Sequence, residues 1–278
     1  MKRFVIFLLG SYLNFINIFS KHIGGRQAFL LFCYPVPLKL KPKQKQFLDT
    51  ADSFKVNFEG KQIAGYRWGE GPKHILFLHG WQSQSYRWKK YIEAFDQQKY
   101  TLFAIDAPGH GNSEGTLFNI PMYARLIGQI LTIHKIDCIV AHSLGAFSSL
   151  CLFYNNLKLS PNKVVILGTP GEANDLVDYF MKELRLTQRV RRNFLRYFWD
   201  YAGHGPEFYS AKEFAKKQTA SALIIHDKDD LEAPYHYAET INQVWLKSKL
   251  ITTENLGHKL RSFEVVESVK TFIEDEEV

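Results

Sequence analysis

Short apolar runs alternate with longer segments along most of this chain, and that alternation limits it to few architectures. The runs are His74–Leu78, Thr101–Ile105, Cys138–Ala141, Val164–Leu167, Ala222–Ile225 and Leu250–Thr252. Continuous apolar runs are typical of strands buried on both faces, and intervals of about 20 residues or more can hold crossover helices between parallel strands. Ahead of them, Phe54–Phe58 and Gln62–Trp68 predict an antiparallel hairpin. The sequence therefore predicts an α/β fold with a mostly parallel sheet and flanking helices.

One interval between the apolar runs is longer than a crossover needs. More than 50 residues separate Leu167 from Ala222, which indicates an insertion rather than a single connection. We expect a cap at about residues 170–218, inserted in a domain that spans residues 51–278. Residues 1–50 are expected to form a separate amphipathic helical segment with a basic linker.

The formal charge of +7 is unevenly distributed along the chain. The first 48 residues contain eight Lys and Arg and no Asp or Glu, whereas the remainder contains 27 Lys and Arg and 28 Asp and Glu. No recognised nucleic-acid-binding module accompanies this charge, so no nucleic-acid partner is expected. The three cysteines suggest no disulfide framework and favour a reducing compartment, hence a cytoplasmic protein.

The first apolar segment, residues 4–19, is shorter than the roughly 20 residues that cross a bilayer, and no signal-peptide cleavage site follows it. A narrow polar stripe recurs along it at helical spacing: Gly10, Ser11, Asn14, Asn17 and Lys21. The apolar remainder of such a helix must be covered, either by the protein's own surface or by a membrane interface. Both alternatives stay open, and residues 1–34 are the segment that would contact a membrane peripherally.

The expected cap contains a strongly cationic stretch, residues 182–199. It has one acid, Glu183, and six cations: Lys182, Arg185, Arg189, Arg191, Arg192 and Arg196. We interpret it as the solvated face of a packed helix. The alternative is a lid that meets a membrane surface or an acidic substrate.

The first chemical signal is the segment Ala141–Gly145 (AHSLG), which directly follows an apolar run and precedes a helical stretch. A serine on a sharp strand-to-helix turn exposes its hydroxyl, and the turn needs small residues two positions before and after it. Gly145 meets that need, and Ala141 replaces the usual first glycine. Ser143 is therefore the candidate nucleophile.

Three further loops follow predicted strands. After His74–Leu78, the backbone N–H of Trp81 could form an oxyanion hole with that of Leu144. In the segment Asp106–Ser113 we interpret the polar residues as structural, with Asp106 accepting backbone N–H groups. His110 in that segment is a rival base, but it precedes Ser143 in the chain.

The remaining triad candidates lie after the last two predicted strands. The segment Asp227–Pro234 holds four acids, any of which could orient an imidazole. Gly257-His258 follows the final strand, where a histidine can act as a general base. The chain order of Ser143, an acid and then His258 is the order expected of one serine-hydrolase fold.

The segments LHGW, DAPGHGNS, AHSLG, HDKDDLEAP and LGHKL resemble the five signature segments of the α/β-hydrolase superfamily, in the same order. The resemblance extends from about Phe54 to Ile273. It implies a mostly parallel eight-stranded sheet flanked by helices with an inserted helical cap. In that family the acid stands where Asp230 stands, ahead of Ala233-Pro234, which selects Asp230 over Asp227 and Asp229.

The resemblance implies a serine hydrolase that cleaves a carboxylic ester through Ser143, His258 and Asp230 and an acyl-enzyme. The alternatives are a thioesterase or carbon–carbon bond hydrolase with the same triad, or a non-catalytic binding protein on the same fold. The expected partner is a small acyl ester. No cofactor and no metal are expected, because the histidines show no paired ligand spacing, and the sequence does not predict the oligomeric state.

Overall fold

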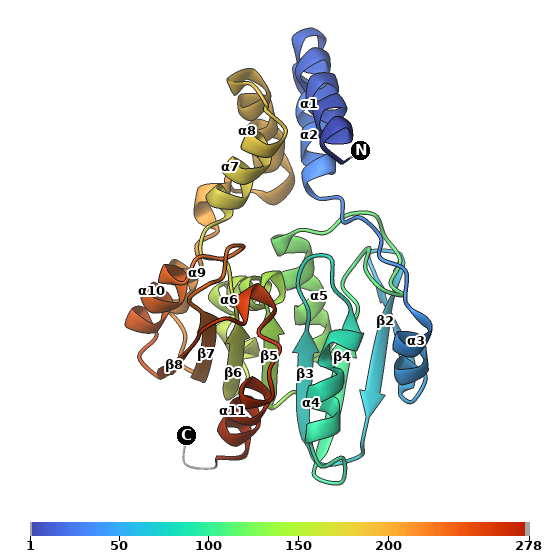
Figure 1. Ribbon diagram of the computed structural model, residues 1–278, viewed down its shortest axis with the longest axis vertical. Coiled ribbons are helices and arrows are strands. Elements are labelled where there is room, and N and C mark those ends of the chain that lie inside the picture. Colours follow the sequence, from blue (N-terminus) through green and yellow to red (C-terminus); the bar gives the residue numbers. More distant parts are fainter. Residues whose placement is uncertain (1, 276–278) are drawn as a thin grey trace. The chain divides into compact units, whose positions relative to one another are not determined.

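The computed structural model describes residues 2–275 (Figure 1). The strands are β1 (Asp52–Phe58), β2 (Lys61–Trp68), β3 (Lys73–Leu78), β4 (Tyr100–Ile105), β5 (Cys138–His142), β6 (Lys163–Leu167), β7 (Ser221–Asp227) and β8 (Ser248–Thr253). The helices are α1 (Lys2–Phe19), α2 (Lys21–Phe32), α3 (Pro42–Leu48), α4 (Lys89–Ala94), α5 (Ile120–Ile133), α6 (Leu144–Asn155), α7 (Ala173–Glu183), α8 (Gln188–Ala202), α9 (Ala211–Ala215), α10 (His236–Val244) and α11 (Phe263–Glu274).

The eight strands form one sheet in the order β1-β2-β4-β3-β5-β6-β7-β8. β1 pairs antiparallel with β2, and β2 pairs antiparallel with β4. All the other pairs are parallel. The predicted mostly parallel eight-stranded sheet is therefore confirmed. Five of the apolar runs coincide with the strands β3 to β7, which are buried on both faces, whereas Leu250–Thr252 lies in the half-exposed edge strand β8.

Helices cover both faces of this sheet. Figure 1 shows α4 and α11 on one face and α5 and α6 on the other. The first face holds a large core cluster, in which Trp88 and Tyr91 pack beside β3 while Val266 and Val269 of α11 pack near β7. With this packing the carboxyl ends of the parallel strands converge on one edge, where polar loops can meet.

The chain divides into two compact units, and the division differs from the predicted domains. The helical unit comprises Met1–Tyr34 and Glu172–Ser210, and the sheet unit comprises Pro35–Gly171 and Ala211–Val278. The predicted N-terminal segment is thus split, because α1 and α2 pack on α8 whereas α3 buries Leu48 in the sheet unit's core.

The insertion is also slightly shorter than predicted at its C-terminal end. α9 lies within the predicted cap range but belongs to the sheet unit. The reason is Phe214, a fully buried side chain of α9 that packs against Phe147 and Tyr154 of α6. At the base of the insertion, the Ser210 hydroxyl donates to the Glu172 carboxylate at 2.7 Å.

Within the helical unit, α2 approaches α8 closely. A Cβ added at Gly25 would lie 2.4 Å from the Asn193 carbonyl oxygen, so only glycine permits this approach. Beside it, the buried Phe29 contacts the rings of Phe194 and Phe198. Among the helices within residues 2–275, none combines the length and apolarity that crossing a bilayer requires.

Candidate active site

Ser143 occupies a sharp turn between β5 and α6. Its backbone has φ 54° and ψ −125°, a conformation that is strained for a residue with a side chain. The turn is tight because α6 starts close to β3: a Cβ added at Gly145 would lie 2.6 Å from the carbonyl oxygens of Leu78 and His79. The residue spacing of the AHSLG segment thus reflects the close passage of a helix and a strand.

The structure brings Ser143, His258 and Asp230 together, although they are far apart in the chain. The His258 Nε2 atom lies 3.0 Å from the Ser143 Oγ atom, and the His258 Nδ1 atom lies 2.8 Å from Asp230 Oδ2. All three residues belong to the sheet unit. Distances of this size allow a proton to pass from the hydroxyl to the imidazole while the carboxylate holds the ring.

Asp230 is held by four hydrogen bonds. Its Oδ1 atom accepts the backbone N–H groups of Glu232 and Ala233, both at 2.9 Å. Its Oδ2 atom contacts His258 and also the Nε2 atom of His226, at 3.2 Å. Burial alone would raise the pKa of this carboxyl, but the hydrogen bonds from the two histidines and a backbone N–H outweigh it and hold the pKa well below its usual range. Asp230 therefore stays ionised at neutral pH.

Two other acids of this loop have different partners. Asp227 accepts the Thr253 hydroxyl and the Leu256 N–H at 2.7 and 3.0 Å, and Asp229 accepts the Asn255 N–H at 2.9 Å. Both carboxylates therefore tie the loop after β7 to the loop that leads to His258. The fourth acid, Glu232, has its exposed carboxylate 4.0 Å from His258 Nε2, so Asp230 is the acid in hydrogen-bond contact with the imidazole.

The two predicted oxyanion-hole residues lie on neighbouring loops. Leu144 is the first residue of α6, where a backbone N–H has no partner within the helix and the helix dipole favours negative charge. Gly80, which precedes Trp81, lies directly beside this turn: an added Cβ would be 3.1 Å from the Leu144 nitrogen and 2.7 Å from the Ser143 Cβ. The two loops thus approach each other next to the nucleophile.

Two buried histidines brace the loop that carries Trp81. The His110 Nε2 atom accepts the Gln82 N–H at 3.1 Å, and the His79 Nε2 atom accepts the Ala107 N–H at 2.9 Å. Burial lowers the pKa of His79 to about 4, and burial with the neighbouring His79 lowers that of His110 to about 3, so both rings are neutral. His110 is held in a structural hydrogen bond and does not contact Ser143 as a base.

The loop after β4 is anchored by Asp106. This buried carboxylate accepts the Ser85 N–H at 2.7 Å and the Asn112 N–H at 2.8 Å. These bonds agree with the structural role that the sequence predicted for it.

Sequence reasoning missed two histidines that adjoin Ser143, His258 and Asp230. His142 is buried next to Ser143, and its Nε2 atom donates to the His258 carbonyl oxygen at 2.7 Å. Burial holds the pKa of His142 well below its ordinary value, so the ring is neutral. The Nε2 atom of His226, the last but one residue of β7, lies 3.2 Å from Asp230 Oδ2 and 2.7 Å from the Ala233 carbonyl oxygen. Each adjoins a predicted site segment, but nothing in the sequence indicates that its ring turns towards the triad.

Within the described residues, no group of three or more His, Cys, Asp or Glu side chains is arranged to hold a metal ion. The polar atoms of the site are instead engaged with one another, as a chain of hydrogen bonds from Ser143 to Asp230. Such a chain suits nucleophilic attack on an electrophilic carbon.

Residues 75–267 match the alpha/beta hydrolase family. Over 109 residues the chain is 23% identical to a protein of Mycoplasma pneumoniae named as an esterase/lipase, a match that covers 37% of this chain and 40% of that protein. Over 47 residues it is 38% identical to the pimeloyl-acyl-carrier-protein methyl ester esterase of Proteus mirabilis, covering 17% and 18% of the two chains. The matched regions of the chain therefore span less than half the length of each of these curated relatives.

Solved structures share the fold at low sequence identity. The esterase EaEST from Exiguobacterium antarcticum has a TM-score of 0.63 at 17% identity, covering 80% of this chain and 99% of that one. The esterase RhEst1 from Rhodococcus sp. ECU1013 has a TM-score of 0.60 at 15% identity, with 80% and 98% covered. The family match over most of the chain and the eight-stranded sheet lead to one conclusion: the chain belongs to the α/β hydrolase family.

Proposed function

We propose that the protein is a serine hydrolase that cleaves carboxylic esters through an acyl-enzyme on Ser143. The observation that carries the proposal is the hydrogen-bonded chain from the Ser143 hydroxyl through His258 to Asp230, with contacts of 3.0 and 2.8 Å. A nucleophile, a base and an ionised acid in that order are the parts that acyl transfer needs.

In the first step His258 acts as general base. Its Nε2 atom takes the proton of Ser143 as the Oγ atom bonds to the ester carbonyl carbon, and the carbonyl π electrons move to the oxygen. The backbone N–H groups of Leu144 and Trp81 stabilise that oxyanion. Asp230 accepts the Nδ1–H and stabilises the imidazolium, without itself becoming protonated.

In the second step the intermediate collapses. His258 gives its proton to the leaving alcohol oxygen, the carbon–oxygen bond breaks, and an ester of Ser143 remains. A water molecule then loses a proton to His258 and attacks this ester. Collapse of the second intermediate returns the proton to Ser143 and releases the carboxylic acid.

Esters are favoured over other acyl substrates for a chemical reason and by the comparisons. Alcohol leaving groups depart more readily than amines, so the triad needs no further machinery. Several of the similar proteins bear the name esterase, which supports an ester substrate for this chain.

The test is hydrolysis of p-nitrophenyl esters of increasing chain length by the parent, Ser143→Ala and Ser148→Ala. Ser148 is a buried serine of α6, the helix that Ser143 precedes, so it is a matched control. We expect Ser143→Ala to lose at least about 10⁴-fold in kcat, and Ser148→Ala to keep parental activity. Comparable hydrolysis by Ser143→Ala and the parent would refute the proposal, and thioester analogues assayed in parallel show whether sulfur leaving groups are preferred.

A further inference from the structure

α1 presents a wide apolar surface to its surroundings. Six large side chains on it have exposed fractions from 49% to 73%: Phe4, Phe7, Leu8, Phe15, Ile18 and Phe19. We call these residues the exposed α1 face. Single exposed apolar residues are ordinary, but a contiguous set along one helix marks an interaction surface.

The other side of α1 packs inside the helical unit through Gly10, Asn14 and Asn17 of the predicted polar stripe together with the fully buried Leu13, whereas Ser11 of that stripe is exposed. The Asn14 amide donates to the Arg185 carbonyl at 3.1 Å and accepts the Thr187 N–H at 2.9 Å. Asn17 is fully buried and accepts from the side-chain amide of Asn193 at 2.9 Å. The helix therefore docks on its own unit through a glycine, two asparagines and Leu13, and most of its large apolar side chains are turned outward.

This orientation is fixed by close packing and by the buried amides. A Cβ added at Gly10 would lie 2.0 Å from the Leu184 carbonyl oxygen, so α1 contacts the α7–α8 turn through glycine. Rotating α1 to bury its apolar side would leave Asn17 and Asn193 without partners in the interior, which is unfavourable. Helices in water normally show the reverse arrangement. Small and polar residues between helices with apolar residues outside are typical of helices that pack in lipid.

Charge indicates which apolar medium the exposed α1 face meets. The helical unit has ten Lys and Arg and six Asp and Glu, and its N-terminal part, Met1–Tyr34, contains no acid. Arg189 donates to the Ile18 carbonyl at 3.0 Å, which brings a cation to the flank of the exposed face.

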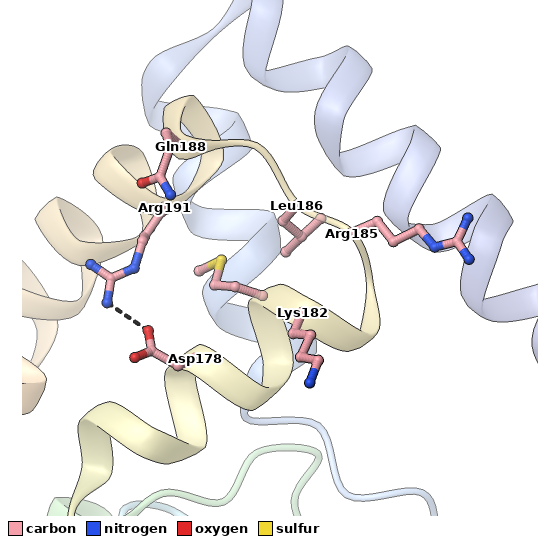
Figure 2. A pocket seen from close by; sticks show the side chains of 7 residues that line it. Asp178, Lys182, Arg185, Leu186, Gln188 and Arg191 are labelled. Atoms are coloured by element: carbon pink, nitrogen blue, oxygen red, sulfur yellow. Dashed lines mark hydrogen bonds and ion pairs between the residues drawn. The ribbon is translucent and has the colours of Figure 1, made fainter.

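Further cations line a hollow of about 370 Å³ between α7 and α8. Figure 2 shows Arg191 of α8 turned to Asp178, while Lys182 of α7 and Arg185 of the following turn extend away from that ion pair. The Arg185 carbonyl oxygen accepts the Asn14 amide of α1. The Arg191–Asp178 pair is at 2.7 Å, so this acid neutralises one cation of the hollow. Cations beside an apolar helix attract anionic headgroups, and each contributes about 1 kcal/mol near a membrane surface.

We propose that the exposed α1 face is a docking surface for an anionic lipid bilayer. α1 lies along the interface, its phenylalanine and leucine side chains enter the boundary between headgroups and acyl chains, and the flanking cations contact phosphate groups. A second copy of this chain fits less well, because pairing two such faces would bring Arg3 and Arg189 of both copies together. The inference does not depend on the ester chemistry.

The experiment is co-sedimentation of the full chain with vesicles, comparing phosphatidylcholine that contains phosphatidylglycerol with phosphatidylcholine alone, at low and high salt. The test variant is Phe7→Gln/Phe15→Gln/Phe19→Gln, because glutamine keeps helix propensity. The control is Ile133→Gln/Leu246→Gln/Phe263→Gln, which removes three exposed apolar side chains of the sheet unit. Circular dichroism and thermal melting verify that both variants fold.

We expect the parent and the control to bind the anionic vesicles, more weakly at high salt, and the test variant to lose about 100-fold in partitioning. The proposal is overturned if the folded parent ignores anionic vesicles or if the test variant binds as the parent does. Sedimentation velocity without vesicles tests the alternative occupant. If the parent is a dimer and the test variant is a monomer, the exposed α1 face binds a second copy of the chain and the proposal is wrong.

Discussion

The substitution Gly145→Ala perturbs the nucleophile turn without touching a triad side chain. The added Cβ would lie 2.6 Å from two carbonyl oxygens of the β3 end, whereas ordinary contact begins at 3.4 Å. The start of α6 must therefore move by roughly 0.8 Å, which carries Ser143 and the Leu144 N–H with it. A misplacement of about 1 Å costs on the order of 10²-fold in rate. We expect kcat to fall about 100-fold with little change in KM, because binding contacts elsewhere remain.

The assay is p-nitrophenyl ester hydrolysis with thermal melting of each variant. Gly128→Ala, in the middle of α5, is the matched control, because its added Cβ would meet only the flexible ends of Leu152, at 3.2 Å, and Leu159, at 3.7 Å. We expect Gly128→Ala to keep parental kcat. If folded Gly145→Ala keeps kcat within about threefold of the parent, the close approach of α6 to β3 does not set the catalytic geometry, and the reasoning fails.

Three further predictions follow from the hydrogen bonds of the site. Asp230→Asn should lower kcat by roughly 10³- to 10⁴-fold, since an amide no longer stabilises the His258 imidazolium, and a pH–rate profile that stays parental would contradict this. His226→Gln should lower kcat less, by about tenfold, because Asp230 keeps its two backbone donors. Burial lowers the pKa of His79 to about 4 and that of His110 to about 3, so below about pH 6.5 the unfolded chain binds more protons than the folded one. The free energy of unfolding in urea should therefore fall by roughly 2 kcal/mol per histidine from pH 7.5 to pH 5. An unchanged free energy of unfolding would refute the claim that His79 and His110 are neutral in the folded protein.

The sheet could be predicted because burial on both faces leaves a simple pattern in the sequence. Five of the apolar runs coincide with the strands β3 to β7. The candidate site residues could be found because each lies shortly after such a run. The geometry of Ser143, His258 and Asp230 then depends on chain order and strand order, both of which the motifs indicate.

The supporting residues could not be predicted because their roles arise from packing between distant segments. His142 and the His258 carbonyl are 116 residues apart, and no spacing rule connects them. The division into two units could not be predicted for the same reason. It depends on contacts between segments that are far apart in the chain, such as the one between Gly25 and Asn193 within the helical unit.

The direction of α1 shows what a periodic pattern leaves open. Gly10, Asn14 and Asn17 of the predicted polar stripe lie on one side of α1, but Ser11 is exposed and Lys21 begins α2, and the sequence does not say which side packs inward. Asn14 accepts the Thr187 N–H and the buried Asn17 accepts from the Asn193 amide, so this side turns inward together with Leu13.

The central claim is that Ser143 is an activated nucleophile, and covalent labelling tests it most directly. The native parent and its Ser143→Ala variant are treated with a fluorophosphonate, followed by intact mass and peptide mapping. The account predicts one label per parental chain, on Ser143, and none on the variant. A folded parent that takes no label, or a variant that is labelled like the parent, would contradict it.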